Sequence, residues 1–511
     1  MKAAPPRTVP KACEPDGRQA LVDVALPPMA ISAPSVTASN TRTSGAGETD
    51  TSALASARWY WFESQEDVPW DAWEALPGGT AYLDRRYLTA MAGHGKVRCR
   101  LGMIKADDGP WLGGILMQAV QSESRSPADH MDVSLGVRIA TAIMQPGGRP
   151  FRFRTLVAGQ GLGSGEHTFL WQEGIPAEWQ VRWTEQAFDA CARHWGIRVW
   201  MAKDFGPERD GALAPHWSRR WARATFDPVM EVPLDPAWTS SDQWQEALRT
   251  KARTKVRSIL ARSADITLDH ITDTDELKRI GPELIGLYEQ VYGRASIVMG
   301  GLEAGDFSNL ARHLADDFTL VTYRENERLV GFHCGMHHAD SKTIEAYYVG
   351  FDPEINKERA LYQRMLFEFI DWGISVNARR VVMGRTALEI KSTLGAFPVP
   401  LSTFVHINLP LAMPFLRWMI RKAPPHDFKP RRAWRAEWCE RWQEAGYQVD
   451  CSPSTPTFPR PVKAAAKEPR MSRTSSTLPA VATVRAERTE GKSNRISTVW
   501  SPAGTTAARK A

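Results

Sequence analysis

The stretch FTLVTYRENERLVGFHCGMHHADSKTIEAYYVGF, residues 318–351, decides the fold of this chain. It holds three apolar segments, at 318–323, 329–337 and 342–351, which are separated by short polar turns. Apolar runs rich in β-branched and aromatic residues, divided by turn residues, are typical of antiparallel strands joined in hairpins. We therefore expect three consecutive antiparallel strands here.

A helix is expected directly after these strands. Apolar residues recur every three or four positions, which buries one helical face; they are Leu361, Tyr362, Met365, Leu366, Phe369 and Ile370. We expect the helix over residues 356–375, a further strand over 379–383, and a loop over 384–392. Hairpins followed by a helix and another strand predict an α/β fold with a mixed sheet.

This order of elements resembles the half of a GNAT-type acyltransferase that holds a thioester or ester donor. Three motifs resemble the FemAB-like branch of that superfamily, which includes peptidoglycan aminoacyl ligases and BioF2-like acetyltransferases. They are YYVGFD at 347–352, Gly384-Arg385, and Glu389-Ile390-Lys391. LRTKAR at 248–253 and YLDRRYL at 82–88 are similar to helices of the same branch. The resemblance covers residues 58–405.

The same order of hairpin, helix and strand occurs, less clearly, in the half of the chain before the central stretch. We therefore expect two GNAT-like lobes in tandem, each with a mixed sheet. The predicted divisions are a disordered tail, two lobes, a helical extension rich in Trp and Arg, and a disordered basic tail. Their bounds are 1–57, 58–236, 237–410, 411–450 and 451–511. Both tails are rich in Pro, Ser, Thr and Ala, which disfavours a packed core.

Composition limits the compartment and the partners. No apolar run reaches the roughly 18 residues that a membrane span needs, and the N-terminus lacks the apolar core of a signal peptide. We therefore expect a cytoplasmic protein. A net charge of +6 permits anionic partners without requiring nucleic acid, so no DNA partner is expected.

The first candidate for catalysis is Lys391, because the resemblance implies an active-site lysine after this strand. A fixed cation beside the oxyanion that forms during amine attack would lower the barrier. In the same segment, Arg385 could bind a phosphate or carboxylate, and Glu389 could orient Lys391 or accept a proton. The alternatives are a surface lysine and an Arg385–Glu389 ion pair.

Other candidates lie on the central strands. Glu345 and Asp352, at the two ends of one strand, are candidate general bases, although Asp352-Pro353 also suits a turn that opens a helix. Tyr347 and Tyr348 should point to opposite faces, so at most one of them meets substrate, and Tyr348 is the candidate. His333 could contact substrate, whereas a metal site with His337 is excluded by about 13 Å of strand.

The predicted basic helix supplies Arg253 and Arg257, which could meet an anionic part of donor or acceptor. A solvated helix face is the alternative. The run Asn356–Ala360 lacks the glycine that GNAT enzymes use to hold the CoA pyrophosphate. The donor therefore stays open among acyl-CoA, acyl-carrier protein and aminoacyl-tRNA. We expect no tightly bound cofactor and no metal.

The resemblance implies an N-acyltransferase that moves an acyl or aminoacyl group from such a carrier to an amine, in envelope or polysaccharide metabolism. The alternative is a non-catalytic protein that binds an envelope precursor or an anionic membrane. The extension carries Trp434, Trp438 and Trp442 at helical spacing beside arginines. That pattern suits either a membrane interface or, more commonly, packing on the protein's own core.

Overall fold

A computed structural model describes residues 51–107, 109–124, 151–293, 297–422 and 428–447. The tails predicted at 1–57 and 451–511 lie outside these residues, except for the last few positions of the first. There, helix α1 (Thr51–Ser56) replaces the predicted disorder, and its Leu54 is buried in the core of the first lobe. Among the described residues, no helix has both the length and the apolar content to cross a bilayer.

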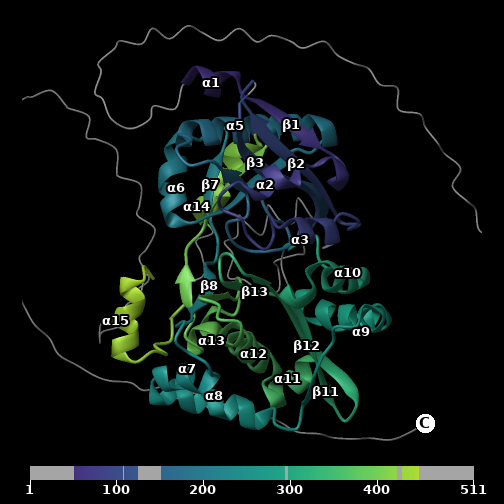
Figure 1. Ribbon diagram of the computed structural model, residues 1–511, viewed down its shortest axis with the longest axis vertical. Helices are drawn as coiled ribbons and strands as arrows, with labels where there is room; N and C mark the ends of the chain where they lie inside the picture. The colour runs from purple at the N-terminus through teal and green to yellow at the C-terminus, as the bar shows by residue number, and fades with distance from the viewer. Residues whose placement is uncertain (1–50, 108, 125–150, 294–296, 423–427, 448–511) are drawn as a thin grey trace, which may run out of the picture. The chain divides into compact units, whose positions relative to one another are not determined.

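Two mixed sheets carry the fold, as the tandem arrangement predicts (Figure 1). Along the first sheet the order is β1 (Arg58–Phe62), β2 (Val97–Lys105), β3 (Trp111–Ser124), β4 (Phe151–Ala158), β6 (Val199–Phe205), β16 (Ser402–Ile407) and β7 (Ala222–Thr225); β5 (Phe169–Trp171) and β10 (Ile297–Met299) also pair with β3. Along the second it is β9 (Thr267–His270), β11 (Phe318–Glu325), β12 (Arg328–His338), β13 (Thr343–Phe351), β14 (Arg380–Val382), β8 (Val229–Pro233) and β15 (Phe397–Val399).

The two sheets repeat one pattern of strand directions. In each, three antiparallel pairings are followed by one parallel pairing and then by two antiparallel ones. The parallel pairs are β4 with β6 and β13 with β14. A helix connects each parallel pair: α5 (Ala177–Trp195) in the first lobe and α12 (Leu361–Ser375) in the second.

The lobes exchange one strand, which differs from the predicted boundaries. After β7 the chain does not return to the first sheet; β8 enters the second sheet between β14 and β15. After β15, β16 enters the first sheet between β6 and β7. The connections are too short to fold back, being residues 226–228 and 400–401. The sheets therefore do not follow the divisions expected at 236 and 410.

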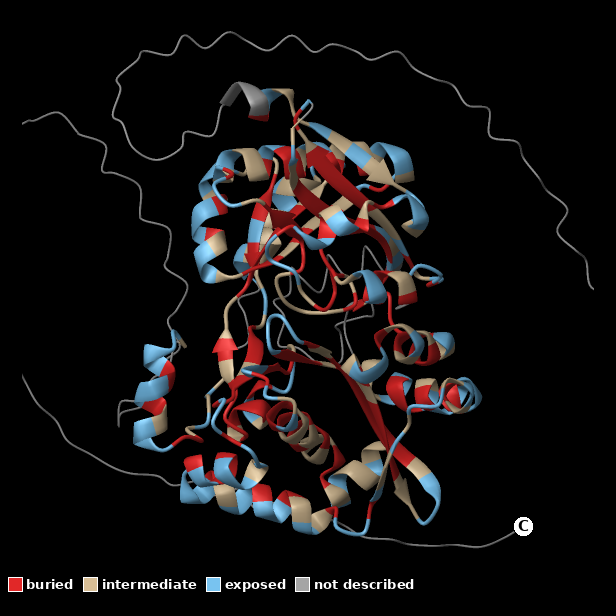
Figure 2. Ribbon diagram, in the orientation of Figure 1, coloured by how far each residue is buried: buried red, intermediate tan, exposed pale blue. Residues whose placement is uncertain are grey.

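Helices fill the remaining layers. The first lobe carries α2 (Trp70–Glu74), α3 (Arg85–Ala90), α5 and α6 (Pro207–Leu213), and the second carries α7 (Ser241–Ala247), α8 (Thr250–Arg262), α9 (Thr274–Tyr292), α10 (Ala304–Leu314), α11 (Pro353–Arg359), α12 and α13 (Leu388–Thr393). Short 3-10 turns lie at Gln65–Asp67, Ala214–His216 and Ala315–Asp317. One hydrophobic core joins residues of both sheets, such as Leu101 and Phe332, and the central strands are mostly buried (Figure 2).

Three local expectations were wrong. The helix expected at 356–375 breaks at Ala360, whose φ of 55° is left-handed, and Asn356 Oδ1 accepts the Tyr362 N–H of the new helix at 2.9 Å. Residues 388–393 form α13 where a loop was expected. The basic helix was expected to run unbroken from Ser240 to about Arg262, but it is divided into α7 and α8. Leu248 and Arg249 between them are extended and pair with backbone near Trp434.

The C-terminal extension forms α14 (Ala412–Lys422) and α15 (Ala436–Glu444). Trp434 and Trp442 are buried, and both rings lie near Trp238 with centroids about 6 Å away. The expectation that this tryptophan stripe packs on the protein's own core is thus met for α15.

Candidate active site

A cavity of about 720 Å³ is lined by residues of both lobes. The first lobe contributes the loop residues 164–167 and the start of α6, and the second contributes the starts of β13 and β14 and part of β8. Ser164 and Gly165, at the end of the glycine-rich run 159–165, are thus part of the cavity wall. Successive side chains of a strand point to opposite faces of the sheet, and this alternation decides which strand residues line the cavity.

Strands β13 and β14 separate at this cavity. Their last pair is Glu345 with Val382, after which β14 ends and β13 continues to Phe351. Thr343, Glu345 and Val382 line the cavity, whereas Ile344 and Val381 pack in the core that includes α12. The carboxyl of Glu345 is therefore placed beside the point where two parallel strands diverge.

Glu345 lies in surroundings that disfavour its charged form. It is 6% exposed, and it makes no hydrogen bond or ion pair with any residue that the structure describes. Burial raises the pKa of Glu345 to about 8; Arg380 opposes this shift and Glu231 adds to it. A carboxyl with a pKa this close to neutrality can accept a proton from an amine and release it again.

Arg380 and Glu231 form the electrostatic surroundings of Glu345. Arg380 Nη1 lies 3.6 Å from Glu231 Oε2, and Arg380 Nε donates to Thr343 Oγ1 at 3.1 Å. Burial also raises the pKa of Glu231, although Arg380 opposes the rise. Two glutamates thus share one arginine, which leaves the group short of positive charge.

His167 forms the opposite wall and was missed in the sequence. Its Nδ1 lies 3.1 Å from Thr80 Oγ1, and its ring centroid is 4.4 Å from that of Tyr82. Burial and then Lys203 lower the pKa of His167 to about 3, so the imidazole is neutral at physiological pH. Its Nε2 lies 3.3 Å from the Ser164 carbonyl, so both ring nitrogens have partners in the first lobe and the imidazole adds no charge to the cavity wall.

The cavity as a whole is acidic. Its lining contains five glutamates and two arginines; the glutamates are Glu166, Glu173, Glu208, Glu231 and Glu345. Glu166 is paired with Arg209, whereas Glu173 and Glu208 are exposed to solvent. Such a lining favours a cationic ligand over a phosphorylated one.

Arg385 does not line this cavity, contrary to the expectation that it binds substrate. Its Nη2 lies 2.5 Å from Asp204 Oδ1 of the first lobe, and Nη1 donates to the Asp227 carbonyl at 2.7 Å. Lys203 Nζ lies 2.9 Å from the other Asp204 oxygen. Burial would raise the pKa of Asp204, but Lys203 and Arg385 lower it below its usual value. This cluster joins the lobes.

Lys391 is also outside the cavity lining. It is 2% exposed, and Nζ donates to the carbonyls of Gly384 at 3.1 Å and Arg385 at 2.6 Å. Burial lowers the pKa of Lys391 to about 7. It points neither into the cleft nor into solvent, so we interpret it as a group that holds the turn after β14. Glu389 pairs with Arg431 at 2.8 Å instead of with Arg385 or Lys391.

Two further candidates serve the fold. Asp352 caps α11 by accepting the N–H of Glu354 and of Ile355, and it pairs with Arg328 at 2.6 Å, which is the turn role considered for it. His333 is buried, with Nδ1 2.9 Å from the Tyr323 hydroxyl and its ring against Phe369. It lies outside the cavity lining, so the substrate role expected for His333 has no support.

Tyr347 and Tyr348 do not alternate as expected. Opposite the step from Cys334 to Gly335, β13 carries one extra residue, Tyr347, and this bulge breaks the period of two. Both hydroxyls therefore reach the first lobe: Tyr347 bonds the Tyr87 hydroxyl at 3.0 Å, and Tyr348 donates to the Leu162 carbonyl at 2.6 Å. Tyr348 thus holds the loop that walls the cavity and does not line it.

Arg253 and Arg257 belong to α8, which packs against α11 and α12 on the face of the second sheet away from the cavity. Arg257 is exposed and Arg253 half-buried. No hydrogen bond or ion pair joins either guanidinium to a residue among those described. They are available to an anionic partner, but not to a ligand inside the cavity.

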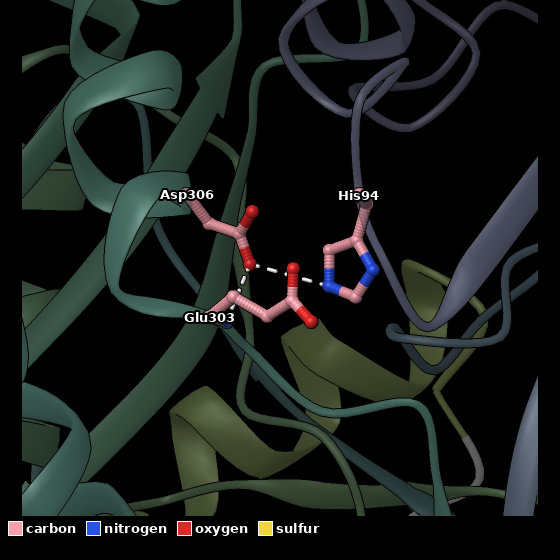
Figure 3. A group of neighbouring side chains, drawn as sticks. All are labelled: His94, Glu303 and Asp306. Atoms are coloured by element: carbon pink, nitrogen blue, oxygen red, sulfur yellow. Dashed lines mark hydrogen bonds and ion pairs between the residues drawn. The ribbon is translucent and has the colours of Figure 1, made fainter. Parts of the chain in front are cut away.

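One cluster has the composition of a metal site. Ligand atoms of His94, Glu303 and Asp306 lie within 4.8 Å of one another (Figure 3). Lys96 N–H donates to His94 Nδ1, which places the proton on Nε2, 3.2 Å from Asp306 Oδ2. Asp306 and Glu303 also accept backbone N–H groups at the start of α10 and at Gly95. These bonds already use the ligand atoms, so the cluster fastens α10 to the first lobe.

Comparison with known proteins agrees with this fold. Residues 246–392 match the family model described as acetyltransferase (GNAT) domain, which confirms the GNAT recognition from sequence over this part of the second lobe. No curated protein matches the chain in sequence.

Solved structures similar to this chain have low identity. FemX is 10% identical, with 71% of this chain and 100% of that chain covered and a TM-score of 0.42. A tandem GNAT protein from the clavulanic acid biosynthesis pathway is 12% identical, with 69% and 99% covered and a TM-score of 0.41. Saccharomyces cerevisiae N-myristoyltransferase with bound myristoyl-CoA is 10% identical, with 69% of this chain and 79% of that chain covered and a TM-score of 0.40. Similarities this low identify no substrate.

Proposed function

We propose that this protein is an N-acyltransferase whose reacting groups meet beside Glu345. The observation that carries the proposal is a buried carboxyl without a partner among the described residues, facing a cavity where the parallel strands of a GNAT domain separate. The function expected from sequence is kept, but the site moves from Lys391 to Glu345. FemAB-like membership is part of the same proposal.

In the proposed reaction, an acceptor amine attacks the carbonyl carbon of an acyl or aminoacyl ester or thioester. A carbon–nitrogen bond forms, the bond to the carrier oxygen or sulfur breaks, and the carrier leaves as an alcohol or thiol. An acceptor that arrives as an ammonium first releases one proton to water, which gives the neutral amine that attacks. The Glu345 carboxylate takes the proton that the nitrogen loses as the amide forms, and that proton then passes to the leaving alcohol or thiol group. His167 and Arg380 are placed to orient the acceptor within the cavity.

The acceptor that fits best is a cationic amine without phosphate groups. Glu173 and Glu208 are exposed at the cavity, and their charge attracts an ammonium and repels phosphate. An acceptor from envelope or polysaccharide metabolism would thus present its amine on a segment free of phosphate.

We assign the donor to the other face of the second sheet. There α8 and its N-cap Arg249 present six basic residues, and no acidic residue lies between 248 and 264, beside α11 and α12. Such a face suits the anionic part of acyl-CoA, acyl-carrier protein or a charged tRNA. The N–H of Tyr362 is already used by Asn356, which disfavours pyrophosphate held at the start of α12. All three donors place the reaction in the cytoplasm.

The test is an activity screen of the full chain with these three donor classes and a panel of amines, followed by Glu345→Gln. Removing a general base lowers kcat/KM by about 10²–10⁴-fold. Glu389→Gln, which removes an exposed carboxylate from the same lobe, is the matched control and should act like the wild type. If Glu345→Gln turns over normally, Glu345 is not the base. If no donor supports turnover but a precursor binds, the non-catalytic alternative holds.

A further inference from the structure

Helix α14 packs differently from its neighbour α15. For the Trp- and Arg-rich extension at 411–450, packing on the protein's own core and contact with an anionic membrane were the two alternatives. In α15, Cys439 and Trp442 are buried, but α14 has no buried residue along its length. Residues 412–413 and 416–420 are half-buried where the helix lies against β7 and β16, so α14 rests on the first sheet while apolar side chains of its outer side stay exposed.

Exposed apolar side chains are concentrated at this helix. Among the described residues, five large hydrophobic side chains are exposed, and three of them lie together at 409–415. They are Leu409 at 42%, Leu411 at 87% and Phe415 at 39%. Phe415 stacks on Trp418, with ring centroids 5.8 Å apart, which extends the apolar surface along the helix.

The backbone at Leu411 strengthens this observation. Its φ of 63° lies in the left-handed region, which a leucine rarely adopts because its Cβ crowds the backbone. The strained turn directs a nearly fully exposed leucine into solvent.

The charge of the segment indicates which kind of partner fits this surface. Residues 408–422 contain Arg417, Arg421 and Lys422 and no acidic residue. Arg421 and Lys422 are exposed, whereas Arg417 Nη2 donates to the carbonyls of Arg219 and Trp221 and ties the helix to the first lobe. Aromatic and aliphatic side chains beside cations match the boundary between headgroups and acyl chains.

We propose that the α14 surface, residues 409–422, binds an anionic lipid bilayer. Leu411, Phe415 and Trp418 enter the headgroup boundary, and Arg421 and Lys422 meet lipid phosphates. A second copy of the chain fits less well, because pairing two such faces would bring their cations together. The surface is separate from Glu345 and does not depend on the proposed acyl transfer.

The experiment is co-sedimentation of the full chain with phosphatidylglycerol vesicles and with phosphatidylcholine vesicles. We expect pelleting with the anionic vesicles only, weakened by salt. Leu411→Glu/Phe415→Glu should abolish it. Arg421→Gln/Lys422→Gln, which changes only exposed side chains, should weaken it about 30-fold, because each cation near an anionic surface contributes about fivefold.

Tyr60→Glu is the matched control, since Tyr60 is an exposed aromatic residue of the first lobe at 44%. It should bind as the wild type does. Equal pelleting of the wild type and both α14 variants would overturn the proposal, because another part of the chain would then bind lipid. Dimerisation that is lost in the α14 variants, without vesicle binding, would assign the surface to a second copy and overturn it as well.

Discussion

The two lobes share one order of strand directions but differ at the position where their parallel strands separate. In the first lobe the last parallel pair is Ala158 with Ala202, both fully buried. In the second it is Glu345 with Val382, on the cavity. The same fold thus provides a packed junction in one lobe and an acid beside a cavity in the other, so the chemistry depends on a few side chains and not on the topology.

The segments that follow β4 and β13 also differ between the two lobes. After β4 the first lobe has the loop around 159–168, which reaches the cavity with Gly165 and His167. After β13 the second lobe has α11 and α12, which cover the opposite face of its sheet. We infer that the first lobe supplies a wall and the second supplies the proton acceptor.

The loss of the Glu345 carboxyl, described above, is the largest effect we expect on activity. The next largest concerns the ion cluster that joins the lobes. Asp204→Ala leaves Lys203 and Arg385 buried without their carboxylate, and breaking such a pair costs about 3–5 kcal/mol of unfolding free energy. Urea denaturation measures this loss. Glu389→Gln, at an exposed pair, should cost less than about 1 kcal/mol, and equal losses in both variants would disprove the joining role.

The two buried lysines offer a sharper contrast. Lys203 in the first lobe has a carboxylate partner, whereas the Nζ of Lys391 in the second is bonded to backbone carbonyls. With a folded pKa of about 7 against 10.5 in the unfolded chain, Lys391 makes the unfolded state bind more protons between these values.

Wild-type stability relative to Lys391→Met should therefore rise from pH 7 toward pH 10.5, by up to about 1.4 kcal/mol per pH unit. Denaturation of both proteins across this range measures the difference. A difference that does not change with pH would show that Lys391 stays charged when buried.

The neighbours of Glu345 allow its pKa to be moved both ways. Activity should increase with pH up to about 8, since only the carboxylate can accept a proton. Glu231→Gln removes a charge that raises this pKa and should shift the inflection to lower pH. Arg380→Gln removes one that lowers it and should shift the inflection upward, each by on the order of one unit. Shifts in the same direction would exclude Glu345 as the titrating group.

The smallest effect is expected at the basic helix. Arg249→Gln/Arg253→Gln/Arg257→Gln should raise KM for the donor several-fold at low salt and reduce its salt dependence, because these charges would meet the carrier. The control is Arg182→Gln/Arg193→Gln/Arg198→Gln, a set of exposed arginines on the first lobe. The same kinetics for both variants across a salt series would leave α8 as a solvated helix face.

Much of the second lobe could be predicted from local pattern. The strands at 318–351 and the amphipathic α12 follow from turn residues and helical spacing, which act over a few positions. Glu345 was among the candidates because it lies near the start of a central strand, and sites gather at strand ends. Glu231, Arg380 and His167 were missed, although an acid between apolar residues at Val229–Pro233 is a signal that could have singled out Glu231.

The sequence by itself determined the class of fold and the two mixed sheets, because these depend on short-range periodicity and turn chemistry, and its motifs carried the resemblance to GNAT proteins. Only the tertiary structure decided the strand exchange, the burial of Lys391, the pairing of Arg385 with Asp204 and the exposure of α14. Those outcomes depend on contacts between residues far apart in the chain. A lysine or a tryptophan has the same local pattern whether it meets a cavity, a carbonyl or solvent, and only packing distinguishes them.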